Sequence, residues 1–437
     1  MMALDTLLRE RDAQGRPIRV GLIGAGATGK AVALQLLTPI PGLALAAIAN
    51  RSAERARAAF QEAGVNRVEP VETPEGLDRM IDQAVPAIVT DPGVLSRARG
   101  IDVIVEVTGT VEFAARAVAD AISHRKHVVL VNAELDSTLG PLLARRAREA
   151  GVVLTNTDGD EPGVAMTLLR YLRSIGLKPV AAGNLKGMVD YYRTPATQEG
   201  FARTHGQEVR KVTSFADATK LSMEATILAN GSGFRVGRRG MYGPSCDHVS
   251  EIAGRLPAES MLAGGLVDYA LGAAPHTGAF VVVHEENPAK QRLLAYYKLG
   301  AGPFYVFYTP FHLPHIQVAA TIARAALLND PTVAPLGPPV CETITVAKRD
   351  LQPEETLDGV GGFLTYGLVD NAGAAREIGA LPMGLSEGCR LVRAVARDMP
   401  VRFEDVEIPS GRLIDTLWAE QLDWAAVTAS AGPGDSK

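Results

Sequence analysis

The sequence predicts an α/β protein with an N-terminal doubly wound parallel sheet, an α+β middle part and a small β-rich C-terminal part. Three observations indicate this division. A β-branched run at residues 18–23 leads through a glycine-rich turn into a helical apolar pattern. Helical and strand patterns mix from about residue 157, and a proline-rich stretch near residues 334–339 precedes further β-branched runs. We therefore expect three domains, at residues 1–156, 157–334 and 335–437. The middle domain would also carry the oligomer contacts, and its last helix, which is apolar almost all round, would return to pack on the first domain.

The composition is that of a globular protein that does not bind nucleic acid. Hydrophobic residues make up 47% of the 437 residues and charged residues 21%, with a net charge of −5, so there is no basic excess. Cys246, Cys341 and Cys389 are too far apart in sequence for a zinc motif or a disulfide framework, and a buried position is the simpler interpretation of Cys341 and Cys389. No secretory signal or membrane-length apolar run is evident. We expect a cytoplasmic protein, in a homo-oligomer, with a small-molecule substrate.

The glycine-rich turn reads GAGATG at residues 24–29 and stands between a predicted strand and a predicted helix. That context is the one that a Rossmann dinucleotide fingerprint requires. Gly24 would make the tight turn, Gly26 would let the backbone approach a pyrophosphate, and Gly29 would let helix and strand pack closely. Ala27 and Thr28 would lie at the helix N-terminus, where anions are favoured. A purely structural glycine turn is the alternative.

The end of the second predicted strand indicates which dinucleotide is bound. An NAD-specific site carries an acidic residue there to bind the ribose hydroxyls. This sequence has Asn50, Arg51 and Ser52 instead. A guanidinium pairs well with a 2′-phosphate, and a serine hydroxyl can add a donor. The stretch therefore favours NADP(H), unless Arg51 is simply a solvated residue at a helix start.

Two further predicted strands end in residues that would line the nicotinamide side of the site. One ends at Thr108 and Gly109, and the other at Asn132, followed closely by Glu134. The carboxyl ends of parallel strands line the ligand crevice in such sheets. Glu134 is a catalytic candidate, or alternatively an acid stabilised at a helix N-terminus.

These strand ends resemble those of a known family. "EVTG" followed by a strand ending at Asn132 resembles the nucleotide domain of homoserine dehydrogenase. A narrower resemblance covers most of the chain: homoserine dehydrogenase-like oxidoreductases with a C-terminal SAF domain, which include the deoxyxylulose-phosphate reductoisomerase-like (DRL) enzymes. The stretches that carry it are "ALDTLLRERDAQGRPIRVGLIGAG", "GDEPG", "TKLSMEATILANGSG", "GAGPFYVFYTPFHLPHIQVAATIARAALL" and "VAKRDLQPEETLDGVGG".

The sequence departs from homoserine dehydrogenase at one informative place. Those enzymes carry a lysine directly after the asparagine at the strand end, whereas here Ala133 and Glu134 follow Asn132. An Asn-x-Glu ending is similar to the reductoisomerase-like group instead. The resemblance implies an SAF-like C-terminal domain with a capping and assembly role.

An acidic turn in the middle part is a candidate metal site. Asp158, Asp160 and Glu161 lie within four residues at a glycine turn. Carboxylate oxygens are the ligands that Mg²⁺ and Mn²⁺ prefer, and a reductoisomerase needs such an ion to hold the hydroxyl and carbonyl oxygens of its substrate. The alternative is that Asp160 merely caps the following helix.

Lysines with nearby carboxylates are the candidates for acid–base catalysis. Lys220, at the start of a predicted helix, has the register of a catalytic lysine if the resemblance holds, and Glu224 is four residues later on the same face. An ordinary exposed ion pair is the alternative. Lys186 and Asp190 are a second, weaker pair, either one helical turn apart or flanking a loop.

Four basic residues are candidates for holding the anionic end of a substrate. Arg238 lies in a glycine-interrupted stretch, and Lys298 in a tyrosine-rich stretch with two histidines. A solvated loop and an ordinary strand core are the alternatives for these stretches. The four residues are Arg238, Lys298, His312 and His315.

These observations predict an NADP(H)-dependent oxidoreductase acting on a small polyhydroxylated, phosphorylated carbonyl or hydroxy compound. The resemblance implies 1-deoxyxylulose 5-phosphate as the substrate, with reduction and rearrangement to methylerythritol phosphate. The alternatives are a sugar or sugar-acid dehydrogenase, a homoserine dehydrogenase, and an NADP(H)-binding sensor or scaffold without turnover.

Overall fold

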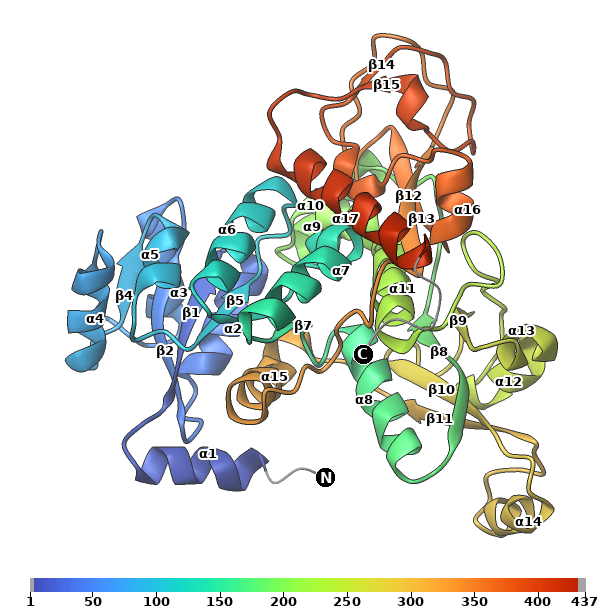
Figure 1. Ribbon diagram of the computed structural model, residues 1–437, viewed down its shortest axis with the longest axis horizontal. Helices are drawn as coiled ribbons and strands as arrows, with labels where there is room; N and C mark the ends of the chain where they lie inside the picture. Colours follow the sequence, from blue (N-terminus) through green and yellow to red (C-terminus); the bar gives the residue numbers. More distant parts are fainter. Residues whose placement is uncertain (1–3, 431–437) are drawn as a thin grey trace. The chain divides into compact units, whose positions relative to one another are not determined.

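The computed structural model describes residues 4–430 and divides the chain into two compact units (Figure 1). Unit 1 comprises Met1–Asp160 and Leu313–Ala334, and unit 2 comprises Glu161–His312 and Pro335–Lys437. Neither unit is therefore a single continuous stretch of sequence. Among the described residues, no helix is long and apolar enough to span a membrane.

Unit 1 is built on a seven-stranded sheet in the order β3-β4-β2-β1-β5-β6-β7, and every neighbouring pair is parallel. The strands are β1 (Ile18–Ile23), β2 (Leu43–Ala49), β3 (Glu69–Pro70), β4 (Ala87–Val89), β5 (Val103–Glu106), β6 (His127–Leu130) and β7 (Leu154–Asn156). Strands β1, β4, β5, β6 and β7 are buried along nearly their whole length, as expected of a parallel sheet that is covered on both faces, whereas the short edge strand β3 is exposed. The predicted α/β class and the N-terminal Rossmann-like sheet are confirmed.

Two layers of helices accompany this sheet. In one layer α1, α2 and α3 lie with α15, and in the other α4 to α7 contact one another in sequence. The helices are α1 (Leu4–Ala13), α2 (Ala27–Leu37), α3 (Ala53–Glu62), α4 (Pro74–Asp82), α5 (Pro92–Arg97), α6 (Glu112–Ser123), α7 (Ala133–Ala150) and α15 (Pro314–Leu328). Although α15 follows unit 2 in sequence, Val318, Ile322 and Ala323 belong to the same hydrophobic cluster as residues of β1, α2 and α3.

Unit 2 contains a four-stranded mixed sheet in the order β11-β10-β8-β9. The strands are β8 (Lys178–Lys186), β9 (Leu266–Leu271), β10 (Ala279–His284) and β11 (Phe304–Thr309). The accompanying helices are α8 (Glu161–Ser174), α9 (Pro195–Thr204), α10 (Val209–Ala216), α11 (Thr219–Ser232), α12 (Ile252–Arg255), α13 (Ala258–Leu262) and α14 (Pro288–Tyr296). Both α8 and α11 contact β8, and every residue of α11 is buried.

The C-terminal part of unit 2 has short strands joined by long loops. It contains β12 (Cys341–Ala347), β13 (Thr365–Asn371), α16 (Ala372–Glu377), β14 (Arg390–Leu391), β15 (Val406–Glu407) and α17 (Leu413–Ser430). The antiparallel pair β12 and β13 packs on α11, where the hydroxyls of Thr226 and Thr343 lie 2.9 Å apart. A buried ion pair between Lys348 and Asp217, 2.8 Å long, adds a second tie to the middle of the unit. The three-domain boundaries and the SAF-like character of this part stay predictions.

Candidate cofactor and catalytic sites

The glycine-rich turn after β1 has the geometry of a phosphate-binding turn. Gly24 has a φ of +112°, which favours glycine, and a Cβ added at Gly29 would collide with the carbonyl oxygen of Gly24. Gly26 is the N-cap of α2, and a Cβ there would meet nothing within 4 Å. The turn is thus tight on its inner side and open on its outer side, where the N–H groups of α2 begin.

The turn lies where the strand order of the sheet reverses. From β1 the chain builds β2 on one side of the sheet and β5 on the other. A Cβ on Gly24 would come within 3.1 Å of Val107 and 3.3 Å of Thr108, which follow β5. In parallel sheets a ligand binds at such a switch point, at the carboxyl ends of the strands.

The residues after β2 have three separate roles. The Asn50 side chain accepts a hydrogen bond from the backbone N–H of Ala25 (3.1 Å) and donates one to the carbonyl oxygen of Ser52 (2.8 Å), so it braces the glycine-rich turn. Ser52 is the N-cap of α3, its hydroxyl accepting from the N–H of Arg55. Arg51 is exposed, and none of the described ion pairs includes it. Of the three residues, Arg51 is the one with a side chain available for a ligand.

A buried carboxylate that the sequence analysis missed lies at the end of β5. Glu106 is fully buried and accepts hydrogen bonds from the N–H of Thr108 (2.7 Å) and from the side-chain amide of Asn132 (2.7 Å). Asn132 also caps α7 by accepting from the N–H of Leu135 (2.9 Å). Glu134 lies in the first turn of α7, as its helix-start alternative requires. A lone carboxylate within the apolar run "VIVEV" was the available signal.

In unit 2, a charged cluster forms where α8, α11 and β8 meet. Lys186, the last residue of β8, has its Nζ 2.8 Å from Oε1 of Glu161 and 3.2 Å from Oε2 of Glu224. Asn184, on the same face of β8, donates to Oε2 of Glu224 (2.8 Å). Nδ1 of His312 lies 3.5 Å from Oε2 of Glu161. The cluster therefore joins residues that were predicted as separate candidates.

The opposite charges within this buried cluster favour the ionised forms of Glu161 and Lys186. Burial opposes ionisation of Glu161, but the charges of Lys186 and His312 outweigh it and hold the pKa of Glu161 below its ordinary value. Burial likewise opposes a charged Lys186, yet Glu161 and Glu224 raise the pKa of Lys186 above its ordinary value. Lys186 is consequently a fixed cation and a poor proton donor or acceptor near neutral pH.

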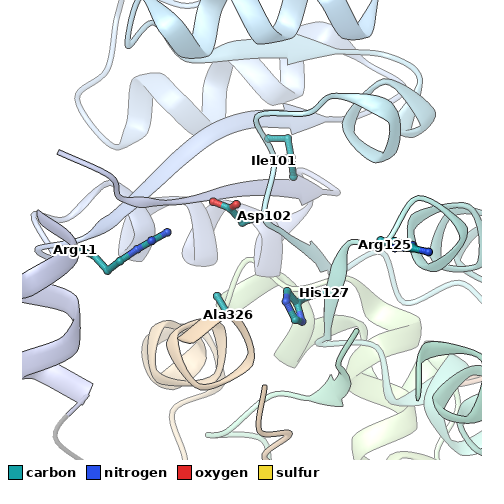
Figure 2. A pocket seen from close by; sticks show the side chains of 6 residues that line it. All are labelled: Arg11, Ile101, Asp102, Arg125, His127 and Ala326. Carbon is teal, nitrogen blue, oxygen red and sulfur yellow. The ribbon is translucent and has the colours of Figure 1, made fainter. Parts of the chain in front are cut away.

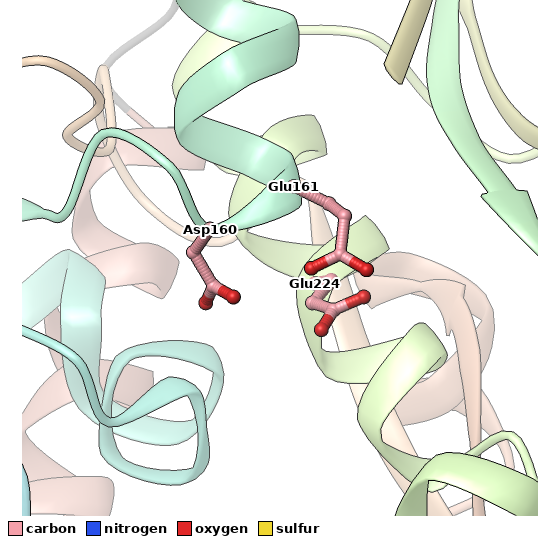
Figure 3. A group of neighbouring side chains, drawn as sticks. All are labelled: Asp160, Glu161 and Glu224. Atoms are coloured by element: carbon pink, nitrogen blue, oxygen red, sulfur yellow. The ribbon is translucent and has the colours of Figure 1, made fainter. Parts of the chain in front are cut away.

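A group of carboxylates that can hold a metal ion lies in the same place. Ligand oxygens of Asp160, Glu161 and Glu224 all lie within 4.8 Å of one another (Figure 3). Asp158, expected as a ligand, is not a member of this group, and its Oδ1 accepts from the N–H of Gly159 (3.0 Å). Glu224 takes its place because α11 packs against α8.

The remaining sequence candidates lie in varied surroundings. Asp190 lies in the loop after β8 and pairs with Arg193 (2.9 Å). Of the two arrangements that the sequence left open, the structure has the loop, because Lys186 ends a strand. Arg238 donates to the carbonyl oxygens of Met241 (2.8 Å) and Tyr242 (3.2 Å), which commits much of its guanidinium to its own loop.

Lysines and histidines among the candidates are also separated by the fold. Lys220 is buried in the first turn of α11, in unit 2. Lys298 is exposed just after α14, in the same unit. His312 belongs to the charged cluster, whereas His315 lies in the first turn of α15, which is part of unit 1. The structure thus brings His312, and neither Lys298 nor Arg238, into ion-pair contact with the charged cluster in the part of the chain that it describes.

A separate pocket in unit 1 lies near the amino ends of the parallel strands, opposite the end where the glycine-rich turn lies (Figure 2). Its lining residues are Arg11, Ile101, Asp102, Arg125, His127 and Ala326. Asp102 precedes β5 and His127 begins β6, so this pocket faces the amino ends of the strands, whereas Gly24 and Thr108 follow the carboxyl ends. The pocket is therefore distinct from the switch point.

Two family models match consecutive parts of the chain. Residues 24–155 match the NAD-binding domain of homoserine dehydrogenase, which includes most of the seven-stranded sheet and the glycine-rich turn. Residues 159–318 match the catalytic domain of the oxidoreductase DRL, which includes the charged cluster. The protein is an NAD(P)-dependent oxidoreductase. No curated protein sequence matches this oxidoreductase.

Solved structures that resemble this chain include a probable dehydrogenase, a myo-inositol dehydrogenase and a reductoisomerase. A probable dehydrogenase from Thermotoga maritima is 14% identical, with 73% of this chain and 90% of that chain covered and a TM-score of 0.40. The myo-inositol dehydrogenase from Lactobacillus casei in complex with NAD(H) and myo-inositol is 13% identical, with 74% and 89% covered and a TM-score of 0.41. The 1-deoxy-D-xylulose 5-phosphate reductoisomerase from Zymomonas mobilis in complex with NADPH is 17% identical, with 48% and 57% covered and a TM-score of 0.33. Similarities this low identify no substrate.

Proposed function

We propose that this oxidoreductase uses NADP(H) to interconvert a carbonyl and a hydroxyl group on a small polyhydroxylated, phosphorylated compound, with 1-deoxyxylulose 5-phosphate as the first substrate to test. The observation that carries the proposal is the buried cluster of Glu161, Lys186 and Glu224, with Asp160 and His312 beside it. All five residues fall within the segment that matches the DRL catalytic domain.

The charge of this cluster fits a divalent cation. Three carboxylates face one lysine, so a net negative charge remains even beside His312. Hard carboxylate oxygens suit Mg²⁺ or Mn²⁺, and such an ion polarises a carbonyl oxygen when a substrate binds. Asp160, Glu161 and Glu224 would hold it, with Lys186 setting the orientation of the two glutamates.

Lys220 is the proposed acid–base residue. The two glutamates that pair with Lys186 keep it protonated, so it is a poor candidate for exchanging a proton with the substrate. Lys220, on α11, is the other lysine proposed for catalysis, and we assign it the proton transfer to the reacting oxygen. The C-terminal β12–β13 pair packs on α11, so we infer that this SAF-like part supports the helix that carries Lys220 and Glu224.

The cofactor preference is proposed from the end of β2. None of Asn50, Arg51 and Ser52 is an acid that would repel a 2′-phosphate, although Glu54 accepts a hydrogen bond from the Ser52 hydroxyl (2.8 Å), and Arg51 is exposed beside the glycine-rich turn that Asn50 braces. Guanidinium groups bind phosphate oxygens with paired, charge-assisted hydrogen bonds. These features favour NADPH over NADH.

The test is NADPH consumption with 1-deoxyxylulose 5-phosphate, after chelation and after adding back Mg²⁺ or Mn²⁺. We expect turnover that requires the metal, that is abolished in Lys220→Ala, and that leaves NADPH affinity unchanged in that variant. Metal-independent turnover of polyols or sugar acids would favour the sugar dehydrogenase alternative instead. Tight NADPH binding without turnover on either panel would refute the proposed substrate class.

A further inference from the structure

Glu106 combines a position at the switch point with complete burial. It is the last residue of β5, and its side chain has no exposed surface. Its Oε1 accepts from the N–H of Thr108 and its Oε2 from the amide of Asn132, each at 2.7 Å. One carboxylate therefore connects the loop after β5 to the loop after β6.

The hydrogen bonds of Asn132 fix the orientation of its side-chain amide and exclude the flipped orientation. Its Oδ1 accepts from the N–H of Leu135 (2.9 Å), and its Nδ2 donates both to Glu106 and to the carbonyl oxygen of Thr110 (2.9 Å). A reversed amide would place a donor against the Leu135 N–H. Both groups bonded to the Glu106 carboxylate are thus fixed as donors, which is the arrangement that an ionised carboxylate requires.

We propose that Glu106 is a positioning residue of the cofactor site, whose ionised carboxylate holds the loops after β5 and β6 in the geometry that receives the nicotinamide end of NAD(P)H. The inference rests on the proposed placement of the cofactor at the carboxyl edge of the sheet. Thr108 and Gly109, which follow β5, and Asn132, which follows β6, lie in these two loops.

Protonation of Glu106 would disturb this connection. A proton on either oxygen needs an acceptor, and since both partners are donors, at least one of the two hydrogen bonds must weaken. Burial raises the pKa of Glu106 to about 7, although the Thr108 and Asn132 groups act in the opposite direction. Among the described residues, the charged side chain that acts on Glu106 is Glu134, in the first turn of α7, and it raises the pKa of Glu106 further. The group therefore titrates in the range where an enzyme works.

The experiment measures the dissociation constant of NADH by fluorescence, from about pH 5.5 to 8.5, on the full chain. NADH is used because it lacks the 2′-phosphate, which titrates in the same range. Three proteins are compared: wild type, Glu106→Gln, and Asp102→Asn. Asp102 is a matched control because its carboxylate also accepts one backbone N–H, from Arg19 (2.8 Å), but at the amino edge of the sheet.

We expect wild-type affinity to weaken about tenfold as the pH falls through about 7, the loss of one hydrogen bond to a charged group. Glu106→Gln should bind about tenfold more weakly at the upper pH and show no such transition, since its amide sets a donor against the donor of Asn132. The loss should be equal for NADPH, because the 2′-phosphate lies at the other end of the cofactor. Asp102→Asn should follow wild type.

Two results would overturn the inference. One is an NADH affinity of the wild type that is constant across the pH range, which needs no variant to fold. The other is a folded Glu106→Gln variant with the wild-type pH transition. Failure of the wild type to bind either cofactor at any pH would instead refute the cofactor placement on which the inference rests.

Discussion

At the scale of the residue, Arg51 is the side chain on which the proposed preference for NADPH depends. Replacing it with alanine removes a guanidinium beside the proposed 2′-phosphate position and touches no described partner. We expect the dissociation constant for NADPH to rise about tenfold or more, while that for NADH stays nearly constant. Arg55→Ala is the control, since Arg55 is likewise an exposed arginine but lies on α3. An equal loss of affinity for NADPH and NADH would contradict a contact with the 2′-phosphate and would show that Arg51 instead supports the fold around α3.

Lys186 provides a second prediction at this scale. Lys186→Met leaves the buried carboxylates of Glu161 and Glu224 without their cation, and removing one partner from a buried ion pair costs about 3–5 kcal/mol. The free energy of unfolding, measured with urea, should fall by that amount. Lys290→Met is the control, because the pair of Lys290 with Glu285 is half exposed and is worth less than about 1 kcal/mol. Similar losses in both variants would show that water reaches the cluster.

Sequence patterns identified most charged residues of the cluster but not their pairing. Lys186, Glu224 and His312 were each singled out by residue type and local spacing. Their contacts depend on how α8, α11 and β8 pack, which involves residues far apart in the chain. Glu106 was missed because a single acid within an apolar strand run looks like a tolerated exception. Its partners, Thr108 and Asn132, become visible only when β5 and β6 pair.

At the scale of the element, the six-residue glycine-rich turn contains one glycine that the fold requires and another that cofactor binding requires. Gly29→Ala should destabilise unit 1, since its Cβ would collide with the carbonyl of Gly24, and both stability and cofactor affinity should fall. Gly26→Ala has open space around its Cβ, so stability should be retained while NADPH binds more weakly, the pyrophosphate no longer approaching the backbone. Thermal unfolding and NADPH titration of both variants test this. If both variants bound NADPH weakly and kept the wild-type stability, the backbone around Gly29 could accommodate a Cβ without destabilising unit 1.

The turn was predictable from sequence in a way that the loop after β8 was not. A strand, a GxGxxG turn and a helix are local features, and each requires its own residues. In "GNLKGMVDYY" the glycines and mixed polarity leave both a helical turn and a loop open. The strand ending at Lys186 is decided instead by its pairing with β9 and β10, which come much later in the sequence.

At the scale of the whole molecule, unit 1 depends on a helix that the chain supplies only after most of unit 2. The apolar stretch "IQVAATIARAALL" of α15 predicts a buried helix that returns to pack on the nucleotide domain. In the structure Val318, Ile322 and Ala323 pack into the cluster that includes Val32 and Leu36 of α2, the helix whose N-terminus begins at the glycine-rich turn. This later segment therefore packs against the helix at whose N-terminus we expect the cofactor phosphates to bind.

This dependence gives the last prediction. Ile322→Ala opens a cavity beneath α2, so unit 1 should lose about 2–5 kcal/mol and bind NADPH more weakly, although Ile322 lies nearly 300 residues after the turn. Ile316→Ala is the matched control, because Ile316 lies on the same helix with 43% of its surface exposed and should change little. Urea unfolding and NADPH titration of the two variants measure both effects. If Ile322→Ala lowers the stability without changing the affinity for NADPH, α15 supports the sheet but does not position α2. If neither the stability nor the affinity changes, the packing of α15 contributes nothing to the nucleotide-binding unit.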